Sequence, residues 1–238
     1  MVKKVLKVVR GPHPRRTERA GNRGSVTDAG QILERSRSIV AAAYALLDKA
    51  GLEGLTIRAV LDKTGLSRRA FYERFAGKDD LMLAVFEHTV RLAADHYRAR
   101  VATLTDPLAR MELIVTCIVL GQSTLREGGG NPSGGNTSRR GAAMSLEHLR
   151  LAQTRPDDLQ AALDPLIALI AEQLSRGMEL GSVRVCAPQR LATLVYNLVA
   201  TTVHTELLAQ EARVRDRPRR LQLAADLWEF CRGAIAAP

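Results

Sequence analysis

Two adjacent arginines beside aromatic residues are the part of the sequence best suited to chemistry with a partner. Arg68 and Arg69 directly follow Ser67, and Phe71 and Phe75 come next at helical spacing. A short helix capped by the serine would bury both phenylalanines and leave the arginines on its outer side. Arginine recognises the O6 and N7 atoms of guanine, while hydroxyl and backbone N–H groups suit phosphate. The pattern therefore predicts binding to double-stranded DNA.

A second short segment lies just before this one. Thr56 can cap a helix that ends at Thr64, and Gly65 supplies a tight turn between the two segments. Two brief helices joined in this way form a helix-turn-helix, whose second helix reads the major groove. The alternative is a small helical hairpin with a solvated basic face. The caps, the turn, the aromatic residues and the following Lys78 together favour DNA binding.

The stretch from Leu55 to His88 resembles the DNA-binding segment of TetR-type bacterial transcriptional regulators. That segment has a capped two-helix turn, then an aromatic residue or leucine, tyrosine, any residue, histidine or tyrosine, and phenylalanine, with Lys-x-x-Leu after a short gap. Here the pattern is Phe71-Tyr72-Glu73-Arg74-Phe75, followed by Lys78 and Leu81. The resemblance covers Ile32 to His88 well, and beyond it only the number and lengths of the helices are similar.

This resemblance implies a role for individual residues. Thr56, Tyr72 and Lys78 would contact phosphates, and the two arginines would approach bases or the adjacent backbone. Arg74 stands where the family usually has histidine or tyrosine, and it can still contact a phosphate. The expected DNA-binding residues are Thr56, Ser67, Arg68, Arg69, Tyr72, Arg74 and Lys78.

Most of the net charge lies at the start of the chain. The 238 residues carry a net charge of +10, and residues 1–30 hold eight Lys or Arg against two Asp or Glu, a net charge of +6. Such a charge attracts polyanions. Glycines and prolines interrupt any helical period here, so we expect a flexible arm. It either follows DNA or is a solubilising leader without a binding role.

From residue 31 onward, apolar residues recur at helical spacing, without strand signals. Only nine aromatic residues are present, so the core must consist mainly of aliphatic side chains. We expect an all-α fold with a three-helix helix-turn-helix domain over residues 31–77 and a helical effector-binding and dimerisation domain over residues 78–238. The nine expected helices start near residue 31, after Thr56 and after Ser67, and then span 78–101, 107–125, 142–154, 156–181, 188–211 and 219–236.

Other motifs argue against catalysis and metal binding. Residues 126–141 are rich in glycine, but they lack the preceding strand and the GK[ST] ending of a nucleotide-binding loop, so we expect a flexible loop. Three separate cysteines and five histidines show no chelating spacing, and no nucleophile motif is present. We therefore expect no cofactor, no metal and no enzymatic activity. The sequence has no recognisable signal peptide or membrane span, which predicts a cytoplasmic protein.

The last two expected helices have more apolar surface than one core requires. The resemblance implies that they form a four-helix dimer bundle, which would present two DNA-reading units to a palindromic operator. The alternative is that both helices close a monomeric core. The expected interface residues are Leu191, Val195, Leu198, Val199 and Trp228.

The resemblance also implies a pocket for a small, largely apolar effector in the C-terminal domain. Polar residues at interior-capable positions could anchor it, although each could equally be an ordinary core or surface group. The candidates are Thr116, Cys117, Gln122, His148, Asn197 and Thr201.

Together these features predict a homodimeric regulator, and specifically a repressor that an effector releases from DNA. An activator or a co-repressor-dependent regulator would share the same residues. The alternative from another class is a helical enzyme or lipid-binding protein with a degenerate DNA-binding head.

Overall fold

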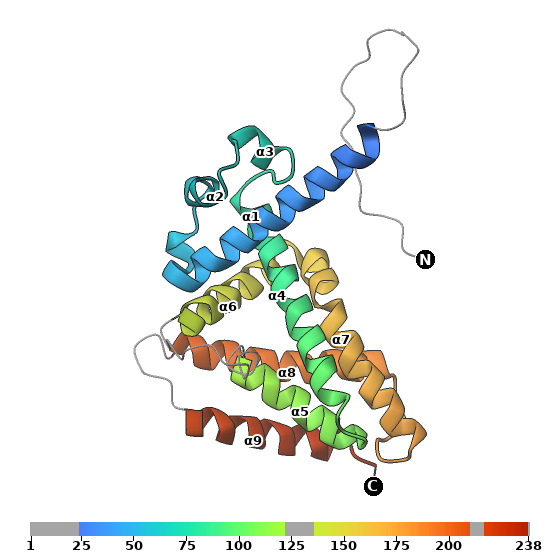
Figure 1. Ribbon diagram of the computed structural model, residues 1–238. Helices are drawn as coiled ribbons and strands as arrows, with labels where there is room; N and C mark the ends of the chain where they lie inside the picture. The colour runs from blue at the N-terminus through green and yellow to red at the C-terminus, as the bar shows by residue number, and fades with distance from the viewer. Residues whose placement is uncertain (1–23, 122–135, 210–216, 238) are drawn as a thin grey trace.

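The computed structural model describes residues 24–121, 136–209 and 217–237, which form nine helices and no strand (Figure 1). One isolated antiparallel bridge joins Val183 to Ala236. The helices are α1 (Gly24–Gly54), α2 (Ile57–Thr64), α3 (Arg68–Tyr72), α4 (Lys78–Val101), α5 (Pro107–Leu120), α6 (Asn136–Thr154), α7 (Pro156–Glu179), α8 (Pro188–Ala209) and α9 (Arg217–Ile235). None of the described helices is long and apolar enough to cross a membrane.

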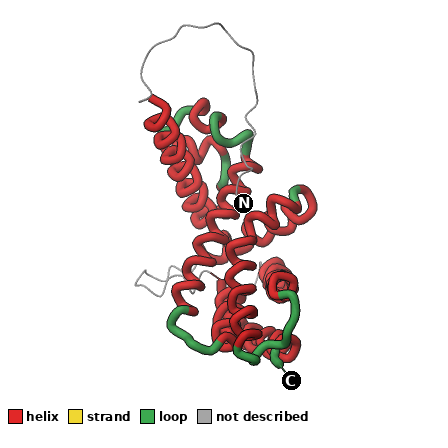
Figure 2. The backbone as a smooth tube through the Cα atoms, turned by 90° about the vertical axis from the view of Figure 1, so that its right-hand side faces the viewer, coloured by secondary structure: helices red, strands yellow, loops and turns green. Residues whose placement is uncertain are grey.

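The molecule has two parts, which the side view in Figure 2 shows one above the other. The head comprises α1, α2, α3 and the first turns of α4, and the body comprises the rest of α4 together with α5, α7, α8 and α9. Helix α6 lies between them (Figure 1). The all-helical expectation is therefore confirmed over the described residues.

Local capping signals fix the two short helices of the head. Thr56 Oγ1 accepts a hydrogen bond from the Ala59 N–H at 3.0 Å, and Ser67 Oγ accepts one from the Ala70 N–H at 3.2 Å. Gly65 ends α2 with a φ of 68°, a left-handed conformation that glycine adopts without a steric penalty. The predicted caps and turn are confirmed.

Two helix starts were predicted too late. α1 begins at Gly24 rather than near residue 31, and α6 begins at Asn136 rather than at Ala142. Neither early segment contains proline, and a glycine costs only about 1 kcal/mol relative to alanine inside a helix, which is too little to stop it. The rest of the predicted arm, residues 1–23, and most of the predicted glycine-rich loop lie outside the described residues.

Glycine does end or interrupt helices where its φ is positive. Gly51 has a φ of 64° and interrupts α1, although a short helical turn continues to Gly54. Gly121 has a φ of 63° and ends α5 several residues before the predicted end near residue 125. The remaining helix ends agree with prediction to within a few residues, which is the usual ambiguity of such boundaries.

Helix α4 contributes to two separate hydrophobic cores. Leu81, Met82 and Val85 pack in the head, and Phe86 and Val90 pack in the body. Ala143 of α6 also belongs to the head core. The packing therefore does not divide at residue 78, where the sequence suggested a domain boundary, because one continuous helix supplies both cores.

Phe71 anchors α3 to the head. Its side chain is fully buried, and its ring lies 5.5 Å from that of Phe75, centroid to centroid. We expect Phe71→Ala to lower the free energy of unfolding by about 3–5 kcal/mol, because the substitution leaves a cavity under a short helix. Chemical denaturation followed by circular dichroism measures this. Tyr72→Ala, at a neighbouring exposed position, should change the free energy by less than about 0.5 kcal/mol, and equal effects would contradict the anchoring role.

Candidate nucleic-acid interface

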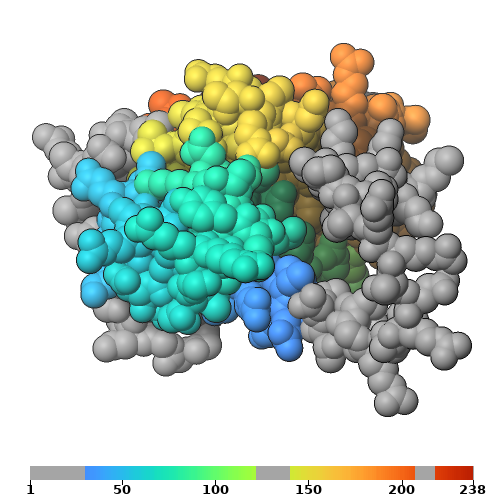
Figure 3. All heavy atoms as spheres, turned by 90° about the horizontal axis from the view of Figure 1, so that it is seen from above, coloured from blue at the N-terminus to red at the C-terminus, as the bar shows by residue number. Residues whose placement is uncertain are grey.

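The α2–α3 pair covers the end of the head that points away from the body (Figure 1). In the view from above, the cyan to teal atoms of this region face the viewer (Figure 3). The turn from Gly65 to Ser67 joins the two helices, and Val60 and Phe71 bury their inner sides. Their outer sides are consequently fixed in direction and open to a partner.

Helix α3 presents its polar side chains outward. Arg68, Arg69 and Tyr72 are exposed, the last by 55%. Arg69 Nε donates to Glu73 Oε1 at 3.0 Å, one turn further along, whereas Arg68 has no ion pair within the described part of the chain. Arg68 is therefore the arginine whose donors are better available to a base edge.

The two capping hydroxyls can serve a second purpose. Thr56 and Ser67 are exposed, and each hydroxyl oxygen already accepts a backbone N–H. Accepting this bond leaves the O–H proton free to donate. Both side chains can thus cap a helix and donate to a phosphate oxygen at the same time.

Lys78 lies at the junction of the head helices. Its Nζ donates to the Leu52 carbonyl oxygen at 3.3 Å, which ties the start of α4 to the end of α1. An ammonium group has three donors, so this bond leaves two for a phosphate. Arg74 is exposed as well. Both residues remain available for the predicted phosphate contacts.

Sequence reasoning missed Arg58 on α2. Its side chain is 88% exposed, and its nearest acidic partner, Asp62, lies at 3.8 Å. The helical period that places Val60 inside places Arg58 outside, so this periodicity could have identified it. Arg58 and the exposed Lys63 extend the basic surface from α3 onto α2.

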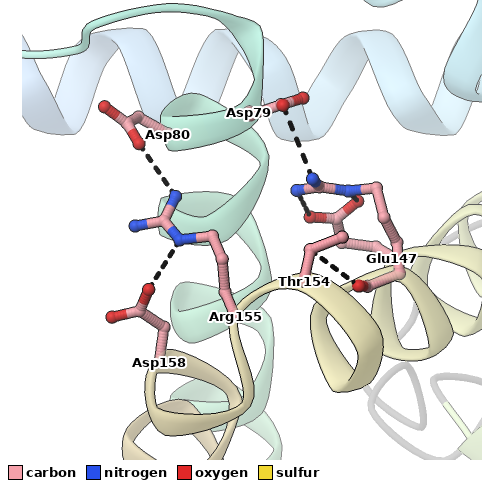
Figure 4. Close-up of polar contacts among 7 residues, drawn as sticks. Asp79, Asp80, Glu147, Thr154, Arg155 and Asp158 are labelled. Atoms are coloured by element: carbon pink, nitrogen blue, oxygen red, sulfur yellow. Dashed lines mark hydrogen bonds and ion pairs between the residues drawn. The ribbon is translucent and has the colours of Figure 1, made fainter.

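Two carboxylates at the start of α4 pair with arginines of α6 and of the turn that follows it. Asp80 accepts from Arg155 at 2.9 Å, and Arg155 also donates to Asp158 at 2.6 Å (Figure 4). Asp79 lies 3.5 Å from Arg150. Sequence reasoning missed these pairs, since Asp80 and Arg155 are 75 positions apart. The pairing reduces the repulsion that the acids would exert on a nearby phosphate.

The expected effector-binding residues do not form one cluster. Asn197 and Thr201 are exposed on α8, which corrects their assignment as interior groups, because they lie on the outer face of that helix. Cys117 is buried but already bonded, since Arg100 donates to its Sγ at 3.3 Å and Tyr97 to its carbonyl oxygen at 3.0 Å. Thr116 is half-buried, and Gln122 lies outside the described residues.

His148 does lie in a buried polar group of the body. Its ring centroid is 4.5 Å from that of His204, and His204 Nδ1 lies 2.9 Å from Ser145 Oγ. Among the described residues, His148 Nδ1 and His204 Nε2 are buried and have no hydrogen-bond partner. Burial lowers the pKa of both histidines, to about 4 for His204, where the nearby His148 adds to the effect. Both rings are therefore neutral at pH 7 and retain unused hydrogen-bonding capacity.

The expected interface residues face mostly inward. Four of them are buried within the chain's own core, which corrects their assignment to a surface, because the wide apolar arc of α8 is largely used by the body. These four are Leu191, Val195, Val199 and Trp228. Leu198 is 36% exposed, and other apolar side chains on the outer faces of α8 and α9 are more so: Leu194 is 59% exposed and Phe230 is 67% exposed.

A shallow hollow adjoins Phe230 on α9. It is lined by Asp226, Glu229, Gly233 and Ala234 in addition to the ring itself. A large exposed aromatic side chain beside small residues is a shape that a partner surface can fill. The outward faces of α8 and α9 are thus the apolar surfaces that a second molecule could cover.

Comparison with known proteins connects this geometry to a family. Residues 39–85, which include α2, α3 and the start of α4, match the family described as bacterial regulatory proteins, tetR family. No curated protein matches the sequence.

Several solved structures share the whole architecture. A TetR-family transcriptional regulator from Pectobacterium atrosepticum has a TM-score of 0.66 at 19% identity, covering 88% of this chain and 98% of that one. A transcriptional regulator from Saccharomonospora viridis in complex with choline has a TM-score of 0.61 at 20% identity, covering 87% and 100%. The regulator FadR from Bacillus subtilis in complex with stearoyl-CoA has a TM-score of 0.59 at 13% identity, covering 82% and 96%. The segment over residues 39–85 thus matches the family of bacterial regulatory proteins, tetR family, and the all-helical architecture is that of the solved TetR-family regulator.

Proposed function

We propose that the protein represses transcription by binding a palindromic operator as a homodimer, and that a small-molecule effector releases it. The observation that carries the DNA-binding step is the outward placement of Arg68, Arg69 and Tyr72 on a helix whose other side is buried. A rigid base of this kind holds side chains in register with base edges. Salt-dependent gel shifts with DNA selected from a random pool test this step, because phosphate contacts make the affinity fall with salt concentration.

Dimerisation would use the outer faces of α8 and α9. Leu194, Leu198 and Phe230 expose apolar area there, which a second copy of the chain can bury. A two-fold axis would then set two heads at about 34–36 Å or a multiple of this distance, as successive major grooves require.

The effector would bind in the body, near His148 and His204. Two buried ring nitrogens without partners in an apolar core are suited to orient a ligand's polar group. Choline in one related fold and stearoyl-CoA in another are chemically unlike compounds, so the shared fold supports an effector site without selecting its ligand. An effector that binds better to the conformation with low DNA affinity lowers operator occupancy by thermodynamic coupling.

The first prediction from this proposed function concerns base recognition. Arg68→Ala should reduce discrimination at a single operator position by about 1–3 kcal/mol, because it removes one bidentate contact with guanine. Lys78→Ala should instead weaken binding to all sequences alike and lower the salt slope by about one unit. Binding measurements over a set of single-base operator variants distinguish the two effects. A uniform loss for the first variant and a sequence-selective loss for the second would reverse the assigned roles.

The second prediction concerns the dimer. Phe230→Asp should shift the protein from dimer to monomer, since the new carboxylate would be desolvated in both copies at the interface. Analytical ultracentrifugation at micromolar concentration measures this, with circular dichroism to confirm that the variant stays helical. Leu149→Asp is the matched control, since Leu149 is exposed and apolar but lies on α6. A wild-type monomer with full operator affinity would rule out the two-headed arrangement.

The third prediction concerns the effector site. His148→Leu should leave the melting temperature of the ligand-free protein unchanged or raise it, because it removes a buried nitrogen without a partner. It should also abolish co-purification of any small molecule that native mass spectrometry detects on the wild-type protein. His96→Leu is the control, since His96 Nε2 is also buried without a hydrogen-bond partner in residues 24–121, 136–209 and 217–237. A lower melting temperature with unchanged co-purification would show that His148 only supports the fold.

A further inference from the structure

Arg140 of α6 reaches across from the body side and is buried against the head. Its side chain is only 4% exposed, and its Nη1 donates to Asp48 Oδ1 of α1. Its guanidinium carbon lies 4.1 Å from the centroid of the Tyr44 ring, also on α1. Arg140 therefore makes both an ion pair and a cation–π contact with one helix of the head.

The same tyrosine links a third helix to this joint. The His88 ring of α4 meets the Tyr44 ring edge-on, with centroids 5.9 Å apart. Helix α4 also runs from the head core into the body core. Tyr44 thus contacts both helices that connect the head to the rest of the molecule.

In each ion pair at this joint, the head supplies the acidic residue and the facing element supplies the arginine. Asp48, Asp79 and Asp80 belong to the head helices, and each pairs with an arginine of α6 or of the turn that follows it. The pairs of Asp79 and Asp80 are partly exposed, so solvent screening leaves them little energy. The pair between Arg140 and Asp48 is the most buried of the three, with side chains 4% and 18% exposed.

A buried ion pair of this kind adds little to the stability of the fold. Desolvating two charges offsets most of their attraction, and apolar residues of similar volume often serve as well. Arg140 Nε also has no hydrogen-bond partner in the part of the chain that the structure describes. The planar guanidinium instead imposes direction, because it must face a ring and a carboxylate at the same time.

We propose that Arg140 is a positioning residue that fixes the angle between head and body, and thereby the spacing of operator half-sites that the protein accepts. This inference rests on the proposed function, since spacing has meaning only for a two-headed DNA-binding protein. The two heads reach successive half-sites only if each leaves the body at a defined angle. A head free to tilt would accept neighbouring spacings as well.

The experiment compares full-length wild-type protein with Arg140→Met on DNA. An operator is first selected from random DNA with the wild-type protein, and its half-sites are then moved apart or together by single base pairs. The variant should lose about fivefold or more of the wild-type preference for one spacing. Its affinity for an isolated half-site should stay within about twofold, since α2 and α3 are untouched.

The matched control is Arg98→Met, because Arg98 pairs with Asp95 inside α4 and does not join head and body. This control should keep the wild-type spacing preference. Arg140→Lys should recover part of it, since lysine restores the charge opposite Asp48 but not the planar contact with Tyr44. If Arg140→Met does not fold, Asp48→Asn removes the same ion pair with almost no change in volume and should broaden the spacing preference equally.

The outcomes separate this inference from the function on which it rests. If the wild-type protein selects no DNA sequence, the proposed function fails. If it selects an operator but the Arg140 or Asp48 variants keep the wild-type spacing preference, the positioning role is wrong. The positioning role is also wrong if the spacing preference falls in proportion to the melting temperature in every variant, including the Arg98→Met control.

Discussion

The proposed DNA-binding surface depends on the burial of Phe71 and Phe75, because α3 is too short to be stable by itself. A helix of five residues lies far below the length at which isolated helices form in water. Its conformation therefore comes from the head core and from the Ser67 cap. Once the two rings are buried, helical geometry leaves Arg68, Arg69 and Tyr72 no direction but outward. The packing that buries the two rings therefore also sets the direction of the exposed polar side chains.

Head and body are connected by helices that contribute to both hydrophobic cores. Helix α4 supplies both cores, so a tilt of its axis must disturb the packing of one or the other. Helix α6 adds a second connection, with Ala143 in the head core and Leu151 in the body core. Cores packed at crystal-like density have few alternative arrangements, which favours discrete orientations of the head over continuous bending.

Two buried histidines are polar groups that the stability of the fold does not explain. Most of its core is aliphatic, yet His148 and His204 keep buried nitrogens that have no hydrogen-bond partner among the residues described. Such groups destabilise a fold unless something else uses them. Keeping such polar groups at one place fits the proposed effector site. Arg140 and His148 lie on the same helix, so α6 would carry both the proposed head-positioning contact and a proposed effector contact.

The sequence by itself determined most of the helices and the outward placement of the proposed DNA-binding residues, because their signals are local. Caps at Thr56 and Ser67, the turn at Gly65 and the start of α4 at Lys78 depend on neighbours a few positions away. Tertiary structure alone decided which helix faces meet. Val199 is buried while the adjacent Leu198 is exposed, and Arg140 pairs with Asp48 across 92 positions. Periodicity identifies an apolar face, but the partner of that face and the rotation of the helix follow from packing the whole chain, since many pairings satisfy the same local pattern.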